Sequence, residues 1–236
     1  MTDTSTIEIF NSFEPRLKLL WEEIEKDADL TPFQSYTWLL NWFETVGKPL
    51  HKITLCIICI YDEDKLEVIL PMGIRKSGVI RKLEWLGGIH SDYMSPIVLN
   101  GAGSIYNNFE YHWKKVLTKL GPFDVLHLLK QLPKTAGLNN KFLEMYPPKN
   151  TVASYQAIFK DGWEDYKNTS INKKILADSK RQRRRLTEIG AIDFKMLSSE
   201  EEIKEITNKM FEFKQQRYKE MNVLNVLKNE EHKNFY

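Results

Sequence analysis

His90, Ser91 and Asp92 carry the three side-chain types of a serine hydrolase and follow one another directly in this sequence. A hydrolase triad passes a proton from serine to histidine, with the carboxylate behind the histidine. Consecutive residues of extended backbone point to alternate sides, so these three cannot line up in that way. The sequence also has no G-x-S-x-G motif, which carries the nucleophile in one large hydrolase class. We therefore expect no triad.

Asp92 and Tyr93 suggest a different chemistry, because they follow Gly87 and Gly88 in a predicted loop at the end of a strand. Such loops often carry recognition groups. A carboxylate and a phenol could bind sugar hydroxyls or an amine, which makes both residues candidates for binding an acceptor substrate. In the alternative interpretation, Asp92 caps a turn and Tyr93 packs into the sheet.

Cys56 and Cys59 form a C-x-x-C motif, the spacing of many zinc and redox sites. They lie, however, in the isoleucine-rich run ITLCIICIY at 53–61, which is typical of a buried strand. Residues three apart on a strand point to opposite faces, so the thiols should diverge. Since the sequence has no second cysteine pair, we expect two small core residues and no metal site.

The stretch DSKRQRRRLTEIG at 178–190 is strongly basic and predicts a helix with a narrow apolar stripe. A solvated helix face is the first interpretation. In the second, Lys180, Arg181 and Arg185, joined by Arg217 one helix later, attract an anionic substrate such as the phosphates of CoA or a nucleotide-sugar. Nucleic acid comes third, because the 236-residue chain has a net charge of only +2 and no stacking aromatics separate the basic residues.

The elements that must position these residues follow from the hydrophobic periodicity. We expect a strand at 6–10, two helices starting near Ser12 and Ser35, a hairpin at 52–75, and further strands at 79–87 and 94–99. A helix at 104–120, a strand at 123–132, a short helix at 138–146 and a strand at 151–159 follow. This order predicts a mixed α/β domain over residues 1–160, with a mixed sheet flanked by helices.

The remainder divides into a connector with the basic helix at 161–190 and a last segment at 191–236. That segment predicts a strand at 191–198 and two helices, so it repeats the strand–helix–helix opening of the chain. A strand and an amphipathic helix cannot bury their faces without a sheet to pack on. We therefore expect residues 191–236 to begin a second domain of the same kind, and the chain to be cut short.

Six stretches together resemble one family in their order along the chain. They are PFQSYTWLLNWF (32–43), LPMGIR (70–75), LEWLGGIHSDYMSPIV (83–98), LHLLKQLP (126–133), KRQRRRLTEIGAIDF (180–194) and FEFKQQR (211–217). The chain resembles GNAT-superfamily acetyltransferases of the CelD/BcsL type, which are associated with cellulose and exopolysaccharide biosynthesis and are related to Fem-type aminoacyl transferases.

This resemblance implies two GNAT-like domains, of which the second is only begun. It also implies acetyl-CoA or another acyl-CoA as co-substrate, held where a splayed strand meets the N-terminus of the following helix. In the second domain that element would come after Tyr236. The first domain offers Gly101, Gly103 and Ser104 at the corresponding turn, but Val98 stands where the family has Arg or Gln, so this turn is a weak donor candidate.

The expected function is therefore transfer of an acyl group from acyl-CoA to a polysaccharide precursor or a cell-envelope acceptor, with no catalytic base assigned and with this chain inactive by itself. One alternative is a non-catalytic module that binds a glycan or peptide. Another is a Fem-like transferase that uses aminoacyl-tRNA, or a nucleic-acid binder. Without a signal peptide or an apolar run of membrane-spanning length, the sequence favours a cytoplasmic location.

Overall fold

The computed structural model describes residues 4–155 and 157–236. The chain divides into two compact units. The first contains the residues up to Pro148 together with Phe211–Tyr236, and the second contains Lys149–Met210. Each unit is described by itself below.

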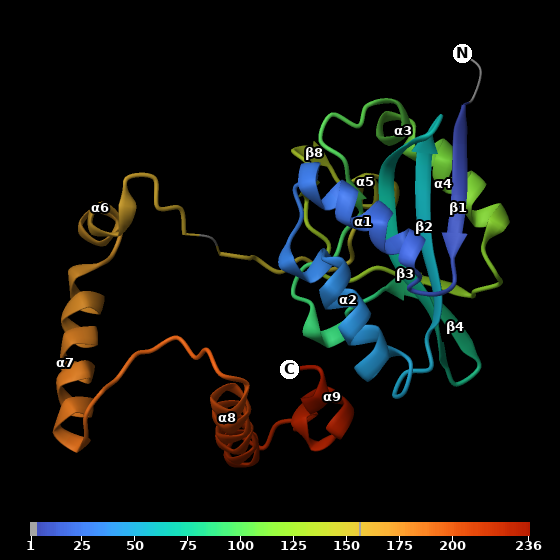
Figure 1. Cartoon of the computed structure of the whole chain (residues 1–236). Coiled ribbons are helices and arrows are strands. Elements are labelled where there is room, and N and C mark those ends of the chain that lie inside the picture. Colours follow the sequence, from blue (N-terminus) through green and yellow to red (C-terminus); the bar gives the residue numbers. More distant parts are fainter. Residues whose placement is uncertain (1–3, 156) are drawn as a thin grey trace. The chain divides into compact units, whose positions relative to one another are not determined.

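A mixed sheet forms the centre of the first unit (Figure 1). Its strands lie in the order β1–β2–β3–β4–β6, and β5 pairs with β3 beyond the end of β4. All neighbours are antiparallel except β4 and β6, which run parallel. The strands are β1 (Ser5–Phe10), β2 (Thr54–Asp62), β3 (Lys65–Ser77), β4 (Ile80–Trp85), β5 (Ile97–Val98) and β6 (Val125–His127), with a separate small pair of β7 (Lys134–Thr135) and β8 (Leu138–Asn139).

The central strand β2 is buried on both faces, as its continuous apolar run predicts. Cys56, Ile58 and Ile60 belong to the hydrophobic cluster on one face, and Ile57 and Cys59 to the cluster on the other. The two free thiols therefore diverge, as predicted from their spacing. Burial raises the pKa of both to about 12, so they are inert core residues at neutral pH.

Helices cover both faces of this sheet (Figure 1). One face packs against α1 (Pro15–Asp27) and α2 (Tyr36–Trp42), and α2 continues as a π-helical turn at Phe43–Gly47. The other face packs against α3 (Ser104–Asn107), α4 (Phe109–Lys119) and α5 (Lys141–Met145). The predicted fold class, a mixed α/β fold with a mixed sheet flanked by helices, is thus confirmed.

Four predictions of local structure were wrong in extent or type. The strand expected at 123–132 is limited to β6, which pairs with β4 only at Lys82–Glu84. The positive φ of Lys130, 52°, also interrupts an extended run to residue 132. The helix expected at 138–146 begins only at Lys141. Residues 151–155, 157–159 and 191–198 form no strand, and position 156 lies outside the described residues. Neither segment pairs with another strand in the described ranges, and an unpaired strand leaves its backbone groups unsatisfied by protein.

The C-terminal residues of the chain group with the first unit. They include the end of α8 (Glu200–Glu220), a 3-10 turn at Val226–Lys228 and the short helix α9 (Glu230–Asn234). Phe211, Leu227 and Phe235 are buried there, and Asn41 Nδ2 of α2 donates a hydrogen bond to the Phe235 carbonyl at 2.8 Å. It remains a prediction that residues 191–236 begin a second GNAT-like domain.

The second unit contains α6 (Gly162–Thr169), α7 (Lys173–Ile189) and the first half of α8. Neither α6 nor α7 has a buried residue. Phe159, Trp163 and Tyr166 pack on one another at the start of this unit, with ring centroids 4.7 to 6.3 Å apart. The described residues of this unit therefore form no hydrophobic core comparable to that of the first.

Two leucines of α1 provide a test of which helix face holds the first unit together. Leu17 is fully buried against the sheet, whereas Leu19 is 68% exposed. We expect Leu17→Ala to lower the free energy of unfolding by about 2 to 5 kcal/mol, because it leaves a cavity in the core. Leu19→Ala, the matched control on the same helix, should change it by about 0.5 kcal/mol or less. Urea unfolding followed by circular dichroism measures both, and equal effects would contradict the assigned packing.

Candidate functional site

The candidate site lies where the strand next to β3 leaves the sheet. Trp85, the last residue of β4, pairs with Met72, and Leu86 N donates to the Pro71 carbonyl at 2.9 Å. Pairing with β3 resumes only at Ile97, which lies opposite Ile69. The residues between, 87–96, leave the sheet edge as a loop, which we call the edge loop. It contains both Asp92 and Tyr93.

Pro71 explains why the strand leaves at this point. In an antiparallel ladder the N–H and C=O of one residue face the same neighbouring strand. The Pro71 carbonyl faces Leu86, so the N–H that proline lacks is missing on that same side. The ladder therefore has no donor to offer the carbonyl of Leu86. A proline inside a sheet is tolerated mainly where pairing is interrupted.

Two glycines begin the edge loop, and each is required by its surroundings. Gly87 has a φ of 102°, and a Cβ at this position would lie 2.0 Å from Ser91 Oγ. Gly88 has a φ of 53°, and its Cβ would lie 3.1 Å from the Trp42 ring. Left-handed backbone and close contact together exclude a side chain at Gly87. The Gly-Gly pair therefore sets the path of the loop toward α2.

Polar side chains from the PFQSYTW segment anchor the loop. Trp38 Nε1 donates to Ser91 Oγ at 3.1 Å, and Gln34 Nε2 donates to the Ser95 carbonyl at 3.1 Å. Gln34 is itself fixed, since its Oε1 accepts a hydrogen bond from Thr31 N at 3.0 Å. Because Gln34, Ser91 and Ser95 are all buried, each of these bonds satisfies a group that water does not reach. Two of the stretches that carry the family resemblance thus meet in space.

Asp92 and Tyr93 lie on the outer side of the anchored loop. Asp92 is exposed, and its Oδ1 lies 3.9 Å from Lys130 Nζ, which donates to the Ser91 carbonyl at 2.6 Å. Tyr93 is half-buried, with its ring 6.1 Å from that of Phe33. A very small pocket of about 10 Å³ opens beside it and is lined by Phe33, Gln34, Leu39, Pro71, Trp85, Leu86, Tyr93, Met94 and Ser95. The surface combines one carboxylate, one ammonium group and two aromatic rings.

A buried pair of histidines lies on the inner side of the loop, and sequence reasoning missed it. His90 Nε2 lies 3.1 Å from His232 Nδ1 of α9, although 142 positions separate the two residues. The Phe235 ring lies 4.7 Å from the His90 ring, and the His51 ring lies 6.4 Å from that of His232. No local pattern in the sequence signals a contact between segments so far apart.

Burial keeps these histidines neutral. It lowers the pKa of His90 from 6.5 to about 4, with smaller contributions from His232, His51 and Lys130. The pKa of His232 is lowered by burial and that of His51 by burial and by Arg75. A hydrogen bond between two rings needs one donor and one acceptor, so protonating both would break it. His90 Nδ1 is buried and has no hydrogen-bond partner within the described residues.

The glycine turn predicted as a weak donor site is occupied by carboxylates of the chain itself. Ser104 Oγ donates to Asp62 Oδ2 at 2.5 Å, and Ile105 N donates to Glu67 Oε2 at 3.3 Å. Gly101 has a φ of 78°, the left-handed conformation that a turn requires, and a Cβ on Gly103 would meet no atom closer than 3.8 Å. A phosphate brought to this turn would meet two acidic side chains where it needs free donors.

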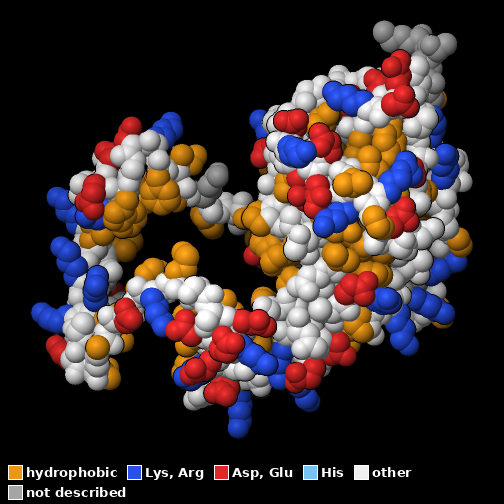
Figure 2. All heavy atoms as spheres, in the orientation of Figure 1, with side chains coloured by type: hydrophobic (Ala, Val, Ile, Leu, Met, Phe, Trp, Pro, Cys, Tyr) orange, Lys and Arg blue, Asp and Glu red, His pale blue; other side chains and the backbone are white. Residues whose placement is uncertain are grey.

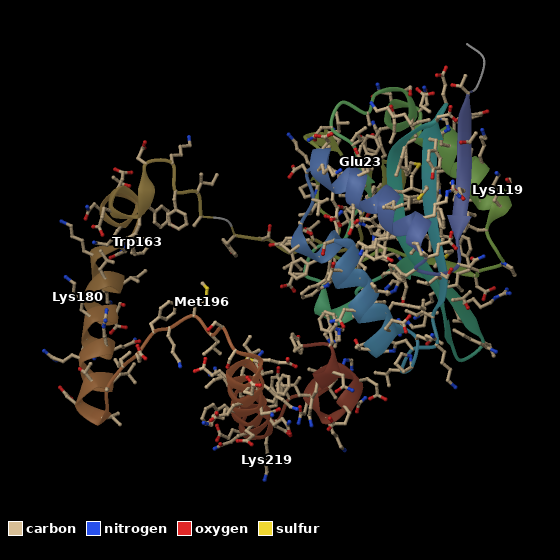
Figure 3. All side chains as sticks on the ribbon, viewed as in Figure 1. Glu23, Lys119, Trp163, Lys180, Met196 and Lys219 are labelled. Carbon is tan, nitrogen blue, oxygen red and sulfur yellow. The ribbon has the colours of Figure 1, made fainter. Side chains whose placement is uncertain are left out.

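The basic candidates are distributed over both units. Lys180 lies on α7 of the second unit (Figure 3). Arg181 and Arg185 lie on the same helix, where Arg181 forms an ion pair with Asp178. Arg217 lies on the part of α8 that groups with the first unit. No shared site is therefore described for these four residues.

Comparison with known proteins adds no identity, because no family model, no curated protein and no solved structure matches this chain. In the described ranges, no three His, Cys, Asp or Glu residues are grouped so that they could hold a metal ion. Over the same ranges, no helix combines the length and apolar character that crossing a bilayer requires. The site must be interpreted from its own geometry.

The histidine pair predicts how stability depends on pH. A histidine with a lowered pKa binds fewer protons in the folded state than in the unfolded chain, so its full contribution is present above pH 6.5 and is lost as the pH falls toward 4. For His90 alone, this amounts to a loss of about 2 kcal/mol in unfolding free energy between about pH 7.5 and about pH 5.

Urea unfolding at both pH values would measure this loss in the wild type, in His90→Gln and in His127→Gln. His90→Gln should show a smaller loss, because it removes the buried titrating group. His127→Gln is the control, since His127 is partly exposed on β6. If the unfolding free energy of His90→Gln depended on pH as that of the wild type does, the loss of stability could not be assigned to His90.

Proposed function

We propose that this chain supplies the acceptor-binding part of an acyltransferase, which moves an acyl group from acyl-CoA to an amine of a polysaccharide precursor or another cell-envelope acceptor. The observation that carries the proposal is the edge loop. It leaves the sheet between β4 and β5, next to the parallel pair of β4 and β6, and it presents Asp92 and Tyr93. The loop belongs to LEWLGGIHSDYMSPIV (83–98), one of the stretches that carry the resemblance to GNAT acyltransferases.

The chemistry of the edge loop suits a sugar that carries an amine. The Asp92 carboxylate is exposed and can accept hydrogen bonds from an ammonium or hydroxyl group. The rings of Tyr93 and Phe33 offer apolar surface to the C–H groups of a pyranose, and the Tyr93 hydroxyl offers a further polar contact. Lys130, 3.9 Å from Asp92, holds the main chain of the loop and limits its movement.

In direct transfer, a base or a water chain takes a proton from the acceptor amine, which attacks the thioester carbonyl while backbone N–H groups stabilise the oxyanion. The C–S bond of the thioester then breaks, and CoA leaves as a thiolate that takes up a proton. The proposal assigns no base. His90 is buried beneath Phe235, and its lowered pKa makes it a weak proton acceptor, so we assign it to positioning the loop. The carboxylates at the Gly101–Ser104 turn disfavour acyl-CoA there, so the proposal assigns no donor site within the described residues.

A binding module without catalysis is the second candidate. Such a module would bind its ligand with the same aromatic rings and the same carboxylate. No described side chain beside Asp92 is placed to act as a general base, and this favours binding without catalysis. The two functions differ in whether the site should bind a free amine more tightly than its acetylated form. A transferase must release its acetylated product, whereas a module has no reason to prefer the free amine.

Calorimetric titration with glucosamine oligomers and with their N-acetylated counterparts tests this difference. We expect the free amines to bind at least about tenfold more tightly, because acetylation removes the charge that faces Asp92. Asp92→Asn and Tyr93→Phe should weaken binding, and Asp64→Asn, an exposed aspartate in the β2–β3 turn, serves as the control. Equal affinity for both oligomers would favour the module, and no binding of either would overturn the proposal.

Acetyl-CoA gives a separate prediction for the Gly101–Ser104 turn. Because Asp62 and Glu67 accept hydrogen bonds from Ser104 Oγ and Ile105 N and would repel a phosphate, acetyl-CoA should leave the melting temperature of the chain unchanged. Thermal unfolding with and without the cofactor measures this. A clear rise that Gly103→Asp abolishes would show that the turn binds the donor after all.

A further inference from the structure

Helix α7 carries opposite chemistry on its two sides. Its 17 residues include seven Lys or Arg and two acidic residues. At about 100° per residue, Ile175, Leu186 and Ile189 fall on one narrow stripe, and the basic residues fall around the rest of the helix. All three apolar side chains are more than half exposed, and Ile189 is 86% exposed. Figure 2 shows the basic side chains following one edge of this helix.

Most of this positive charge is not neutralised by acidic side chains of the described residues. Arg181 pairs with Asp178, and Arg184 lies 3.9 Å from Glu188. The other five basic residues of the helix make no ion pair with any described residue. They are Lys173, Lys174, Lys180, Arg183 and Arg185. By helical position, Arg183 and Arg185 flank the apolar stripe on its two sides. A surface that covers the stripe would therefore also meet these guanidinium groups.

An aromatic group stands near the start of the same helix. Phe159, Trp163 and Tyr166 pack on one another, and Trp163 of α6 is 54% exposed (Figure 3). Trp and Tyr are the residues that favour the boundary between lipid headgroups and acyl chains. The second unit thus exposes basic, aliphatic and aromatic side chains together.

We propose that α7 and this aromatic group bind the surface of an anionic lipid bilayer, with the helix lying in the plane of the interface. A basic helix with a narrow apolar stripe and aromatic residues is the composition of interfacial helices. The apolar stripe enters the headgroup boundary, while Arg183 and Arg185 reach lipid phosphates beside it. This proposal is independent of the acyltransferase proposal.

Two other partners fit the surface less well. A nucleic acid would match the basic side chains, but its phosphate backbone would leave Ile175, Leu186 and Ile189 uncovered. A second copy of the chain could cover the stripe, but it would bring two strongly basic helices together without matching acidic groups. A bilayer with anionic headgroups satisfies both the apolar and the basic side chains.

Co-sedimentation with phosphatidylcholine vesicles, prepared with and without phosphatidylserine, tests the proposal. We expect binding only to vesicles with phosphatidylserine and weaker binding as salt is raised. The triple variant Lys180→Glu, Arg183→Glu and Arg185→Glu should bind at least about 100-fold more weakly. Leu186→Ser with Ile189→Ser should also weaken binding, because the stripe then loses its apolar surface.

The matched control reverses three exposed lysines of the first unit, Lys65→Glu, Lys76→Glu and Lys134→Glu, which changes the net charge equally. It should bind like the wild type, and circular dichroism should show that every variant keeps its helices. If the control variant lost vesicle binding to the same extent, net charge alone would explain the weaker binding, and the proposal would be overturned. Binding to single-stranded DNA but not to vesicles, or a dimer that the triple variant abolishes, would overturn it as well.

Discussion

The missing N–H of Pro71 is the constraint on which the candidate site depends. β3 is a long strand, and two successive strands, β4 and then β5, pair with it. Between the two, the ladder has no donor at Pro71, so a continuous partner strand would leave a carbonyl group unpaired. Leaving the sheet removes this conflict. The edge loop and its exposed Asp92 follow from a backbone requirement of the central sheet.

A loop that leaves a sheet must have its own polar groups satisfied elsewhere. Gln34 and Trp38 do this from α2 and the turn before it, with hydrogen bonds to Ser95 and Ser91. Both side chains sit in a region that is otherwise apolar, packed against Phe33, Tyr36 and Leu39. Buried polar contacts of this kind specify one loop conformation, because any other would leave the amide or indole group without a partner. Gln34 and Trp38 thus hold the edge loop in one conformation before any ligand binds.

Much of this arrangement could be predicted, but only where the signal is local. The alternating faces of β2 separated Cys56 from Cys59, and hydrophobic periodicity predicted the two helices α1 and α2. The prediction of strands at 151–159 and 191–198 was wrong. A high β-propensity indicates that a segment can pair in a sheet, but it does not provide a partner strand. The contact of His90 with His232 had no local signal at all. Pro71 did have one, since a proline inside an apolar strand marks an interruption.

The edge loop and the C-terminal segment share their supports, so neither can move alone. Trp38 donates to Ser91 of the loop, and its ring lies 4.8 Å from that of Phe235. His90, the neighbour of Ser91, touches both His232 and Phe235. A ligand that shifts the loop at Asp92 must therefore either preserve these contacts or release α9 from α2. Because packed contacts of this kind rearrange between discrete states and do not stretch, binding at Asp92 and docking of α9 are expected to be coupled.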